Sequence, residues 1–233
     1  MNLITGMHRS GTSILTKLLL EAGLDLGDRG GFYPPDKWNP DGYFEQKRII
    51  KINMALVNGS CGRLSYAKLP TDHRIEIRAR KQQSEMLSII EEYSNLAVKE
   101  NRFCLTLRAW LKLGLPVAKV LICVRNPYRA TSSLWRRNNL PLFIGYKLLV
   151  EHYSRLLETL RSEDISFKIV EFEKLVDAEK GAATLSSVCD YLEVKIDIRK
   201  ASELIDQNIR PSSFGTNQKS IPLHVSTFYQ ELQ

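Results

Sequence analysis

The 233-residue sequence predicts an α/β fold in which helices flank a parallel β-sheet of four or five strands. Four short apolar runs indicate buried strands, because a strand covered on both faces has a nearly continuous apolar sequence. They are Asn2–Thr5, Phe103–Leu107, Lys119–Val124 and Phe167–Phe172. Segments with helical periodicity separate the runs, and this alternation favours crossover connections that make neighbouring strands parallel.

The segments between the strands are predicted as helices from their apolar periodicity: Ile14–Ala22, Gln46–Val57, His73–Glu100, Ala130–Arg137, Leu142–Arg161 and Ala182–Leu192. Residues Asp25–Gly42 are rich in Gly and Pro and read as a long loop. Its aromatic residues either wall a binding pocket or pack onto the core: Phe32, Tyr33 and Trp38. The tail after Arg210 also reads as a loop. No internal repeat is visible, so residues 1–233 are interpreted as a single domain.

Composition and charge favour a globular protein with an anionic partner. Hydrophobic residues make up 43% of the chain and charged residues 25%, which are the proportions of a folded domain. The net charge of +7 favours nucleotides, acidic sugars, nucleic acid or a membrane surface, without choosing among them.

The four cysteines are far apart and form no Cys-x-x-Cys pair: Cys61, Cys104, Cys123 and Cys189. Such spacing is typical of reduced thiols in a reducing compartment, and we therefore expect a cytoplasmic protein. A signal peptide is not apparent, and each apolar stretch is shorter than the ~20 residues needed to span a bilayer.

The residues Gly6–Ser13 form a candidate phosphate loop between the first strand and the first helix. Backbone N–H groups and the helix dipole point at such a turn and attract an anion. Gly6 and Gly11 allow the backbone to approach the anion closely, and Arg9 adds a fixed positive charge. Hydroxyl donors come from Ser10, Thr12 and Ser13.

A magnesium-dependent ATP site fits this loop poorly. The spacing Gly6-x4-Gly11 is that of a Walker A loop, but Thr12 stands where the lysine is expected. No aspartate follows the strands that end at Leu107 and Val124, whereas a triphosphate with Mg²⁺ needs one. No Cys/His cluster indicates zinc either, so no metal is expected.

A second anion motif begins where the Lys119–Val124 strand ends. Arg125 emerges at the carboxyl end of that strand, which is where α/β sheets bind ligands. Pro127 is suited to the first position of the next helix. Ser133 follows on that helix and is expected to return to the same anion as Arg125, and Arg137 follows one turn later.

These two motifs together resemble the sulfotransferases that use 3′-phosphoadenosine 5′-phosphosulfate (PAPS), in particular bacterial ones. The matching residues are Gly6-Met7-His8-Arg9-Ser10-Gly11-Thr12-Ser13, then Arg125, Pro127, Ser133 and Arg137. The segment Asn39–Glu45 is similar to a further stretch of that family. The resemblance implies a P-loop-type, sulfotransferase-like parallel sheet. It also implies that the first loop holds the 5′-phosphosulfate and that Arg125 and Ser133 hold the 3′-phosphate, with His8 and Arg137 among the binding residues.

The reaction implied by the resemblance is transfer of a sulfuryl group to an acceptor hydroxyl or amine, without a metal. Arg9 would offset charge on the bridging oxygen of the donor. Glu45 is the preferred general base, with Asp41 and His8 as rivals. A competing interpretation of Glu45 is that it caps the helix beginning near Gln46.

One departure from the family keeps other functions open. Many relatives carry a Lys-Asp-Pro-Arg run on the strand before the Arg125 strand, and in Leu105-Thr106-Leu107-Arg108 only the arginine matches. A non-catalytic module that binds PAPS or a polyanion is therefore an alternative, as is a nucleotide or small-molecule kinase. The positive charge slightly favours an acidic glycan or glycolipid as acceptor. Nucleic acid is not expected, a membrane is not required, and the oligomeric state is open.

Overall fold

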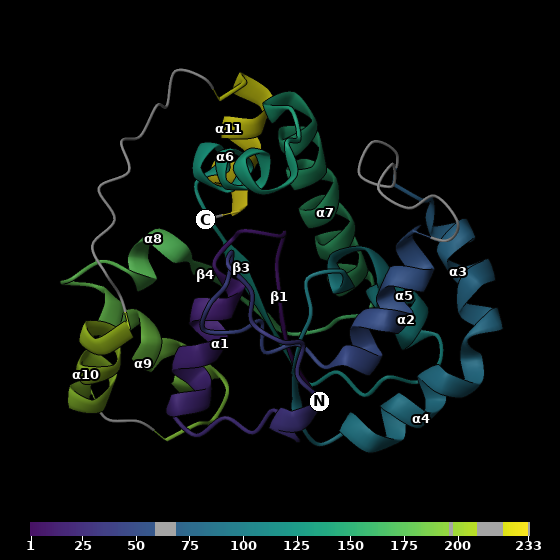
Figure 1. The fold of residues 1–233 in the computed structure, drawn as a ribbon, viewed down its shortest axis with the longest axis horizontal. Coiled ribbons are helices and arrows are strands. Elements are labelled where there is room, and N and C mark those ends of the chain that lie inside the picture. Colours follow the sequence, from purple (N-terminus) through teal and green to yellow (C-terminus); the bar gives the residue numbers. More distant parts are fainter. Residues whose placement is uncertain (59–68, 196–197, 209–220, 233) are drawn as a thin grey trace.

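The computed structural model describes residues 1–58, 69–195, 198–208 and 221–232. This part of the chain forms a four-stranded sheet with the order β2-β1-β3-β4, in which all neighbours are parallel (Figure 1). The strands are β1 (Asn2–Thr5), β2 (Ala97–Lys99), β3 (Lys119–Val124) and β4 (Phe167–Glu171). The predicted α/β class with a parallel sheet is confirmed.

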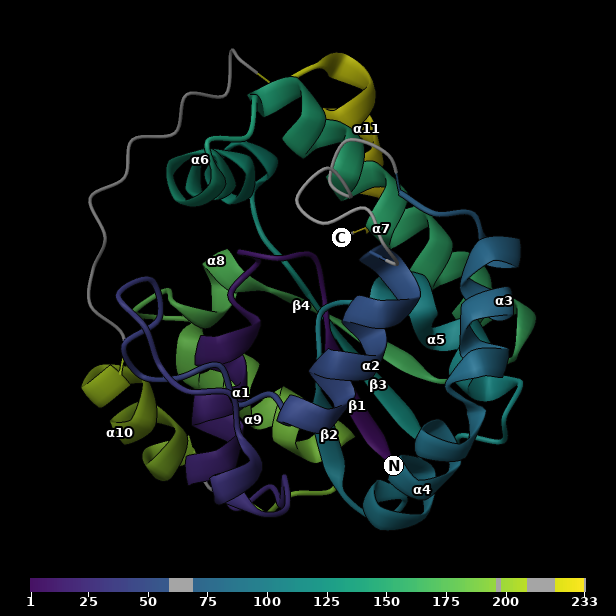
Figure 2. The same ribbon diagram turned by 45° about the vertical axis from the view of Figure 1, so that its right-hand side comes forward.

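Helices cover both faces of the sheet, and the alternation of side chains along each strand supplies both interfaces. On β1 and β3, Leu3 and Ile122 face one helical layer while Ile4 and Cys123 face the other. The first layer contains α2 (Lys47–Asn58), α3 (Asp72–Lys81), α4 (Gln83–Tyr93), α5 (Phe103–Leu111), α6 (Pro127–Asn138), α7 (Leu142–Ser162) and α11 (Leu223–Leu232). The second contains α1 (Thr12–Glu21), α8 (Phe172–Leu175), α9 (Gly181–Tyr191) and α10 (Ile198–Asn208). Figure 2 shows the second layer as a separate group beside the sheet.

The strand order places a crevice at the carboxyl ends of β1 and β3. The chain runs from β1 to β2 on one side and then returns past β1 to β3 on the other. Ligands of open α/β sheets bind where the strand order reverses in this way. Both candidate anion motifs start at this edge, because Gly6 follows β1 and Arg125 follows β3.

Two sequence predictions in the middle of the chain are wrong. The segment His73–Glu100 is not one long helix, since α3 and α4 are followed by the short strand β2. The run Phe103–Leu107 is not a strand but the start of α5, which packs against α2, α3 and α7. A five-residue apolar run has no readable period, and a helix buried on nearly all sides produces the same pattern as a buried strand.

The other elements lie close to their predicted positions. The strand Asn2–Thr5 has the predicted bounds, and the predicted helix Leu142–Arg161 is extended by one residue in α7. The sequence predicts a loop for the tail after Arg210. Residues 209–220 lie outside the described residues, and α11 shows that the later part is helical. The thiols of Cys104, Cys123 and Cys189 are free and buried, and Cys61 lies outside the described residues. Within the described parts of the chain, the helices lack the length and apolarity needed to cross a bilayer.

Candidate active site

The phosphate loop is so tightly packed that two of its positions require glycine. Gly6 has φ 152°, and a Cβ there would lie 2.3 Å from the carbonyl oxygen of Cys123. Gly11 has φ 98°, and its Cβ would lie 2.1 Å from Cδ2 of Phe172. At both positions the positive φ favours glycine, and any Cβ would clash with the Cys123 backbone or the Phe172 ring. The loop is therefore seated directly on the ends of β3 and β4.

A buried tyrosine attaches the loop to β3. The hydroxyl of Tyr153 on α7 donates to the carbonyl oxygen of Cys123 over 2.8 Å and accepts from the N–H of Met7 over 3.2 Å. The thiol of Cys123 donates to the carbonyl oxygen of Ser10 over 3.1 Å. Because these partners are buried, they hold the loop in place before any ligand binds.

The amino end of α1 has the properties of an anion site. The helix starts at Thr12, and the preceding Gly11 has a left-handed backbone. Among the described residues, no side chain caps this end, and no acidic residue lies in the first turn. The first N–H groups of a helix have no partner within the helix, and the dipole adds a partial positive charge. These groups therefore face the loop as anion ligands.

Arg9 links the two predicted anion motifs. Its backbone has φ 72°, a conformation that costs a residue other than glycine on the order of 1–3 kcal/mol. Its Nε donates to Oγ of Ser133 over 2.9 Å, and its Nη1 donates to the carbonyl oxygen of Trp38 over 3.4 Å. Burial, followed by the nearby Arg137, lowers the pKa of Arg9. A guanidinium nevertheless remains charged at neutral pH.

Arg125 has donor capacity that the described residues do not use. Its Nη1 donates to the carbonyl oxygen of Arg9 over 3.3 Å, and its guanidinium lies 4.5 Å from the ring centre of Phe172. Its buried Nε has no hydrogen-bond partner in the described part of the chain. Leaving such a donor unpaired is costly, so an anion at this position would be stabilising.

Arg137 lies in the last turn of α6, the helix that begins just after Arg125. Asn126 caps this helix by accepting from the N–H of Arg129, and Pro127 occupies its first turn, as predicted. The structure brings Arg125 and Ser133 together around Arg9. Arg137 follows Ser133 by one turn on the same face of α6, lines the same cavity, and is the first charged group, after burial, among the causes that lower the pKa of Arg9.

A cavity of about 420 Å³ opens beside the loop. Its lining comes from the loop, the segment between η1 (Arg29–Gly31) and α2, the end of β2 and the end of α6. Predicted site residues in the lining are His8, Arg9, Gly11, Thr12, Ser13, Glu45, Arg125 and Arg137. Gly6, Ser10 and Ser133 lie behind this surface, where Gly6 and Ser10 shape the loop and Ser133 holds Arg9.

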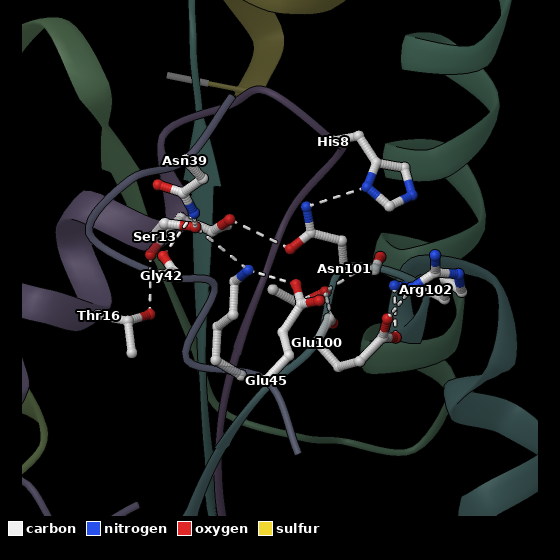
Figure 3. A network of polar contacts seen from close by, with 12 residues as sticks. His8, Ser13, Thr16, Asn39, Gly42, Glu45, Glu100, Asn101 and Arg102 are labelled. Carbon is white, nitrogen blue, oxygen red and sulfur yellow. Dashed lines mark hydrogen bonds and ion pairs between the residues drawn. The ribbon is translucent and has the colours of Figure 1, made fainter. Parts of the chain in front are cut away.

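Glu45 forms a buried ion pair with Lys99 (Figure 3). The Glu45 side chain is 8% exposed and the Lys99 side chain 1%, so bulk water solvates neither charge. Lys99 Nζ also lies 3.5 Å from Oγ of Ser13 in the phosphate loop. Phe44, immediately before Glu45, has φ 56°, which is a second strained position at the site. Charges buried this deeply are tolerated because they are paired.

Lys99 reveals the correct position of the family run. The strand before β3 along the chain is β2, which ends at Lys99 and is followed by Glu100-Asn101-Arg102. This stretch keeps the lysine and arginine of the Lys-Asp-Pro-Arg pattern, with glutamate for aspartate and asparagine for proline. Leu105–Arg108 lies in the helix α5, so the expectation that it corresponds to the family run is wrong. Sequence reasoning missed Lys99, Asn101 and Arg102. The available signal was the polar stretch Lys99–Arg102, which directly follows a short apolar run.

A buried polar network holds this run in position. Glu100 accepts from Nδ2 of Asn53 over 2.8 Å and from the N–H of Arg102 over 2.7 Å, and it pairs with the Arg102 guanidinium. Asn53 in turn accepts from Thr106 and from the indole of Trp110. Burial raises the pKa of Glu100, although Arg102 opposes the shift.

His8 is a neutral imidazole beside the cavity. The hydroxyl of Thr12 donates to Oδ1 of Asn101 over 3.1 Å, which turns the Asn101 amide nitrogen toward Nδ1 of His8 at 3.4 Å. In this arrangement Nδ1 accepts and Nε2 carries the proton. Burial, followed by Arg102, lowers the pKa of His8 well below its usual 6.5.

Two of the three predicted base candidates line the cavity. Glu45 and His8 do so, whereas Asp41 is exposed and pairs with Lys17 at 3.3 Å on the surface. No N–H of α2 in the described chain donates to Glu45. Its carboxylate pairs with Lys99 instead of capping the helix.

Part of the aromatic loop forms a cavity wall. Tyr33 and Trp38 line the cavity, and Tyr33 meets Tyr43 edge to face with ring centres 5.6 Å apart. Phe32 instead packs against Phe44 beside the core. The described residues contain no group of three or more His, Cys, Asp or Glu side chains arranged to hold a metal.

Comparisons with known proteins agree with the fold. Residues 3–197 match the sulfotransferase family. The whole chain is similar in structure to the sulfotransferase domain of the olefin synthase from Synechococcus PCC 7002, with a TM-score of 0.54, 18% identity and 92% of that domain covered. At this identity, the likeness shows the fold alone. No curated protein sequence is significantly similar to the chain.

Proposed function

Since the chain belongs to the sulfotransferase family, we propose that it transfers a sulfuryl group from PAPS to an acceptor hydroxyl or amine. The bond between the sulfuryl sulfur and the bridging oxygen breaks, and the acceptor oxygen or nitrogen forms the new bond to sulfur. The proton of the acceptor passes to a base. The second product is 3′-phosphoadenosine 5′-phosphate (PAP).

The observation that carries this proposal is the meeting of two anion motifs at Arg9. The loop Gly6–Ser13 and the start of α1 provide one anion position, and Arg125 with Ser133 provides another. A nucleotide with separate 5′ and 3′ anionic groups suits two such positions better than a plain triphosphate. The unpaired Nε of Arg125 supports the assignment of the 3′-phosphate.

Three side chains can divide the chemistry among them. Arg9 would offset charge on the bridging oxygen, and Lys99, 3.5 Å from Oγ of Ser13, would attract the sulfuryl oxygens. A donor that draws Lys99 toward the loop would release the Glu45 carboxylate to accept the acceptor proton. Positioning and charge stabilisation then supply most of the catalysis.

The cavity also bears on the alternative functions. A hydroxyl acceptor such as a glycan or glycolipid agrees with the aromatic wall of Tyr33, Trp38 and Tyr43, since sugar rings pack well on aromatic faces. The sequence-based reason for a non-catalytic module was the missing lysine, and the position of Lys99 removes that reason. Thr12 in place of the Walker lysine continues to disfavour a kinase.

Nucleotide binding provides the test. A ligand that binds only the folded state raises the melting temperature, and PAPS and PAP should do so more than AMP or ATP with Mg²⁺. Arg125→Ala should weaken PAP binding by ~2–4 kcal/mol while changing AMP binding little. Arg161→Ala, which removes an exposed arginine near the end of α7, is the control. Equal losses for PAP and AMP, or stronger binding of ATP than PAP, would contradict the proposal.

A further inference from the structure

The three hydroxyl side chains of the phosphate loop differ in what they leave for a ligand. The hydroxyl of Thr12 donates to Oδ1 of Asn101 over 3.1 Å, so its proton is already used within the protein. Ser10 is buried and lies outside the cavity lining. Ser13, in contrast, lines the cavity in the first turn of α1, beside the N–H groups that attract an anion. The Ser13 hydroxyl therefore lies where an anion bound by the loop would meet it.

The oxygen of this hydroxyl already accepts from two protein donors (Figure 3). Nδ2 of Asn39 donates to Oγ of Ser13 over 3.0 Å, and Nζ of Lys99 donates to the same oxygen over 3.5 Å. A hydroxyl has two lone pairs and one proton, and neither an amide nitrogen nor an ammonium group can accept that proton. Within the described residues, the Ser13 hydroxyl donates to no acceptor. Its proton is therefore available to a ligand in the cavity.

The Asn39 amide is held in one orientation by the turn that it closes. Its nitrogen also donates to the carbonyl oxygen of Gly42, which can only accept, so the amide nitrogen and not the amide oxygen faces Ser13. The backbone is fixed as well. The N–H of Asn39 donates to a carboxylate oxygen of Asp36 over 3.0 Å, and the N–H of Gly42 donates to the carbonyl oxygen of Asn39 over 3.1 Å. Asn39 thus offers Ser13 a donor whose direction is set before any ligand binds.

The segment that contains Asn39 has two further contacts with the phosphate loop and α1. Nη1 of Arg9 donates to the carbonyl oxygen of Trp38 over 3.4 Å, and Lys17 on α1 pairs with Asp41 at 3.3 Å. Both contacts hold the segment in place without involving the Asn39 side chain. The attachment of the segment and the orientation of the hydroxyl can therefore be separated by experiment.

We infer that Asn39 is a positioning residue for the sulfuryl donor: it holds the Ser13 hydroxyl so that the hydroxyl proton is donated to the anion at the start of α1. This inference rests on the proposed function, in which that anion is the 5′-phosphate of the nucleotide. Without Asn39 the hydroxyl would rotate, and its lone pairs would face the anion part of the time, which is repulsive. A donor that is already oriented does not have to be ordered when the ligand binds.

Two nucleotides that differ in the 5′-phosphate test the inference by calorimetry. PAP carries this group, and adenosine 3′-phosphate lacks it. Ser13→Ala should lower the affinity for PAP roughly tenfold or more, the scale of a hydrogen bond to a charged group. Asn39→Ala should lower it about three- to tenfold, the scale of one neutral hydrogen bond. Neither variant should change the affinity for adenosine 3′-phosphate, because Ser13 does not face the 3′-phosphate.

A double-mutant cycle shows whether Asn39 acts through Ser13. In the Ser13→Ala background, Asn39→Ala should have no further effect on PAP affinity, because the hydroxyl that it orients is gone. If Asn39→Ala does not fold, Asn39→Asp completes the same cycle. It keeps the shape of the side chain but turns the Ser13 proton toward itself, and the repulsion from its charge is common to both backgrounds. Asp41→Asn is the matched control, because it releases the same segment from Lys17 and should bind both nucleotides as wild type does.

Three results would overturn the inference: unchanged PAP affinity in either single variant, an equally large effect of Asn39→Ala in the Ser13→Ala background, or an equal loss of affinity for adenosine 3′-phosphate. Each would mean that Asn39 does not act on the 5′-phosphate through Ser13. The proposed function would stand in these cases, since its test with Arg125→Ala does not depend on Asn39. Failure of wild type to bind PAP would reject the proposed function and this inference with it.

Discussion

Nε of Arg9 donates a hydrogen bond of 2.9 Å to Oγ of Ser133, and this bond joins segments that are 124 residues apart. Arg9 belongs to the first anion motif and Ser133 to the second. The strained backbone of Arg9, with φ 72°, points its guanidinium across the crevice to α6. Ser133 in the second motif therefore positions the Arg9 side chain of the first motif, in addition to forming part of its own anion site.

Removal of the Arg9 guanidinium should affect catalysis more than binding. Arg9→Ala is expected to lower single-turnover rates at saturating PAPS by ~10²–10³, the scale for losing one donor to developing charge. Arg9→Gly should show the same rate loss as Arg9→Ala. It should unfold with about 1 kcal/mol more free energy than Arg9→Ala, since glycine adopts positive φ without strain. A variant that binds PAP poorly yet reacts at the normal rate would show that Arg9 only anchors the nucleotide.

Replacement of Glu45 should remove the proton acceptor. Glu45→Gln is expected to reduce turnover by ~10²–10⁴, the effect of a lost general base, with PAP affinity close to that of wild type. Asp41→Asn serves as the control, because Asp41 is exposed and paired with Lys17 outside the cavity. If Glu45→Gln retains activity, His8 becomes the remaining base candidate in the cavity lining.

The buried ion pair of Lys99 and Glu45 should also affect the free energy of unfolding. Lys99→Met leaves the Glu45 carboxylate buried without its partner, and this is expected to cost ~3–5 kcal/mol of unfolding free energy in urea titrations. The double variant Lys99→Met, Glu45→Gln should recover much of that loss while remaining inactive. Additive losses in the double-mutant cycle would show that the pair contributes no coupling.

His152 should make the protein less stable in acid. It is buried, its Nδ1 donates to the carbonyl oxygen of Leu148 over 2.6 Å, and burial lowers its pKa to about 4. The unfolded chain binds the proton near the ordinary pKa of 6.5, so this contribution to stability is complete above pH 6.5 and is lost as the pH falls toward 4.

Wild type should therefore lose about 2 kcal/mol more than His152→Leu between pH 7 and pH 5, which follows from the pKa difference at ~1.4 kcal/mol per pH unit. Urea unfolding of both proteins at the two pH values measures the difference. Contributions from titratable groups that His152 does not influence are the same in both proteins and cancel in this comparison. If both proteins lose the same unfolding free energy between the two pH values, the pKa of His152 in the folded protein is not lowered and this prediction is wrong.

The two anion motifs could be predicted from the sequence because each is a local structure. Gly6 and Gly11 shape the phosphate loop within one strand–turn–helix unit, and Pro127 starts α6 immediately after β3. Backbone conformation, helix start and strand end are all decided by neighbours along the chain in such units. The resemblance to sulfotransferases rests on the same local motifs.

Only the tertiary structure decided which distant charges meet. Lys99 and Glu45 are 54 residues apart, and their pairing depends on β2 lying next to β1. The apolar run Phe103–Leu107 has no periodicity that separates strand from helix, so its packing against α7 determined the outcome. Arg137 and Arg9 are far apart in the sequence, yet they line the same cavity and their charges act on each other. Local sequence thus sets the conformation of each motif, whereas buried ion pairs and cavity walls depend on long-range packing that no short segment specifies.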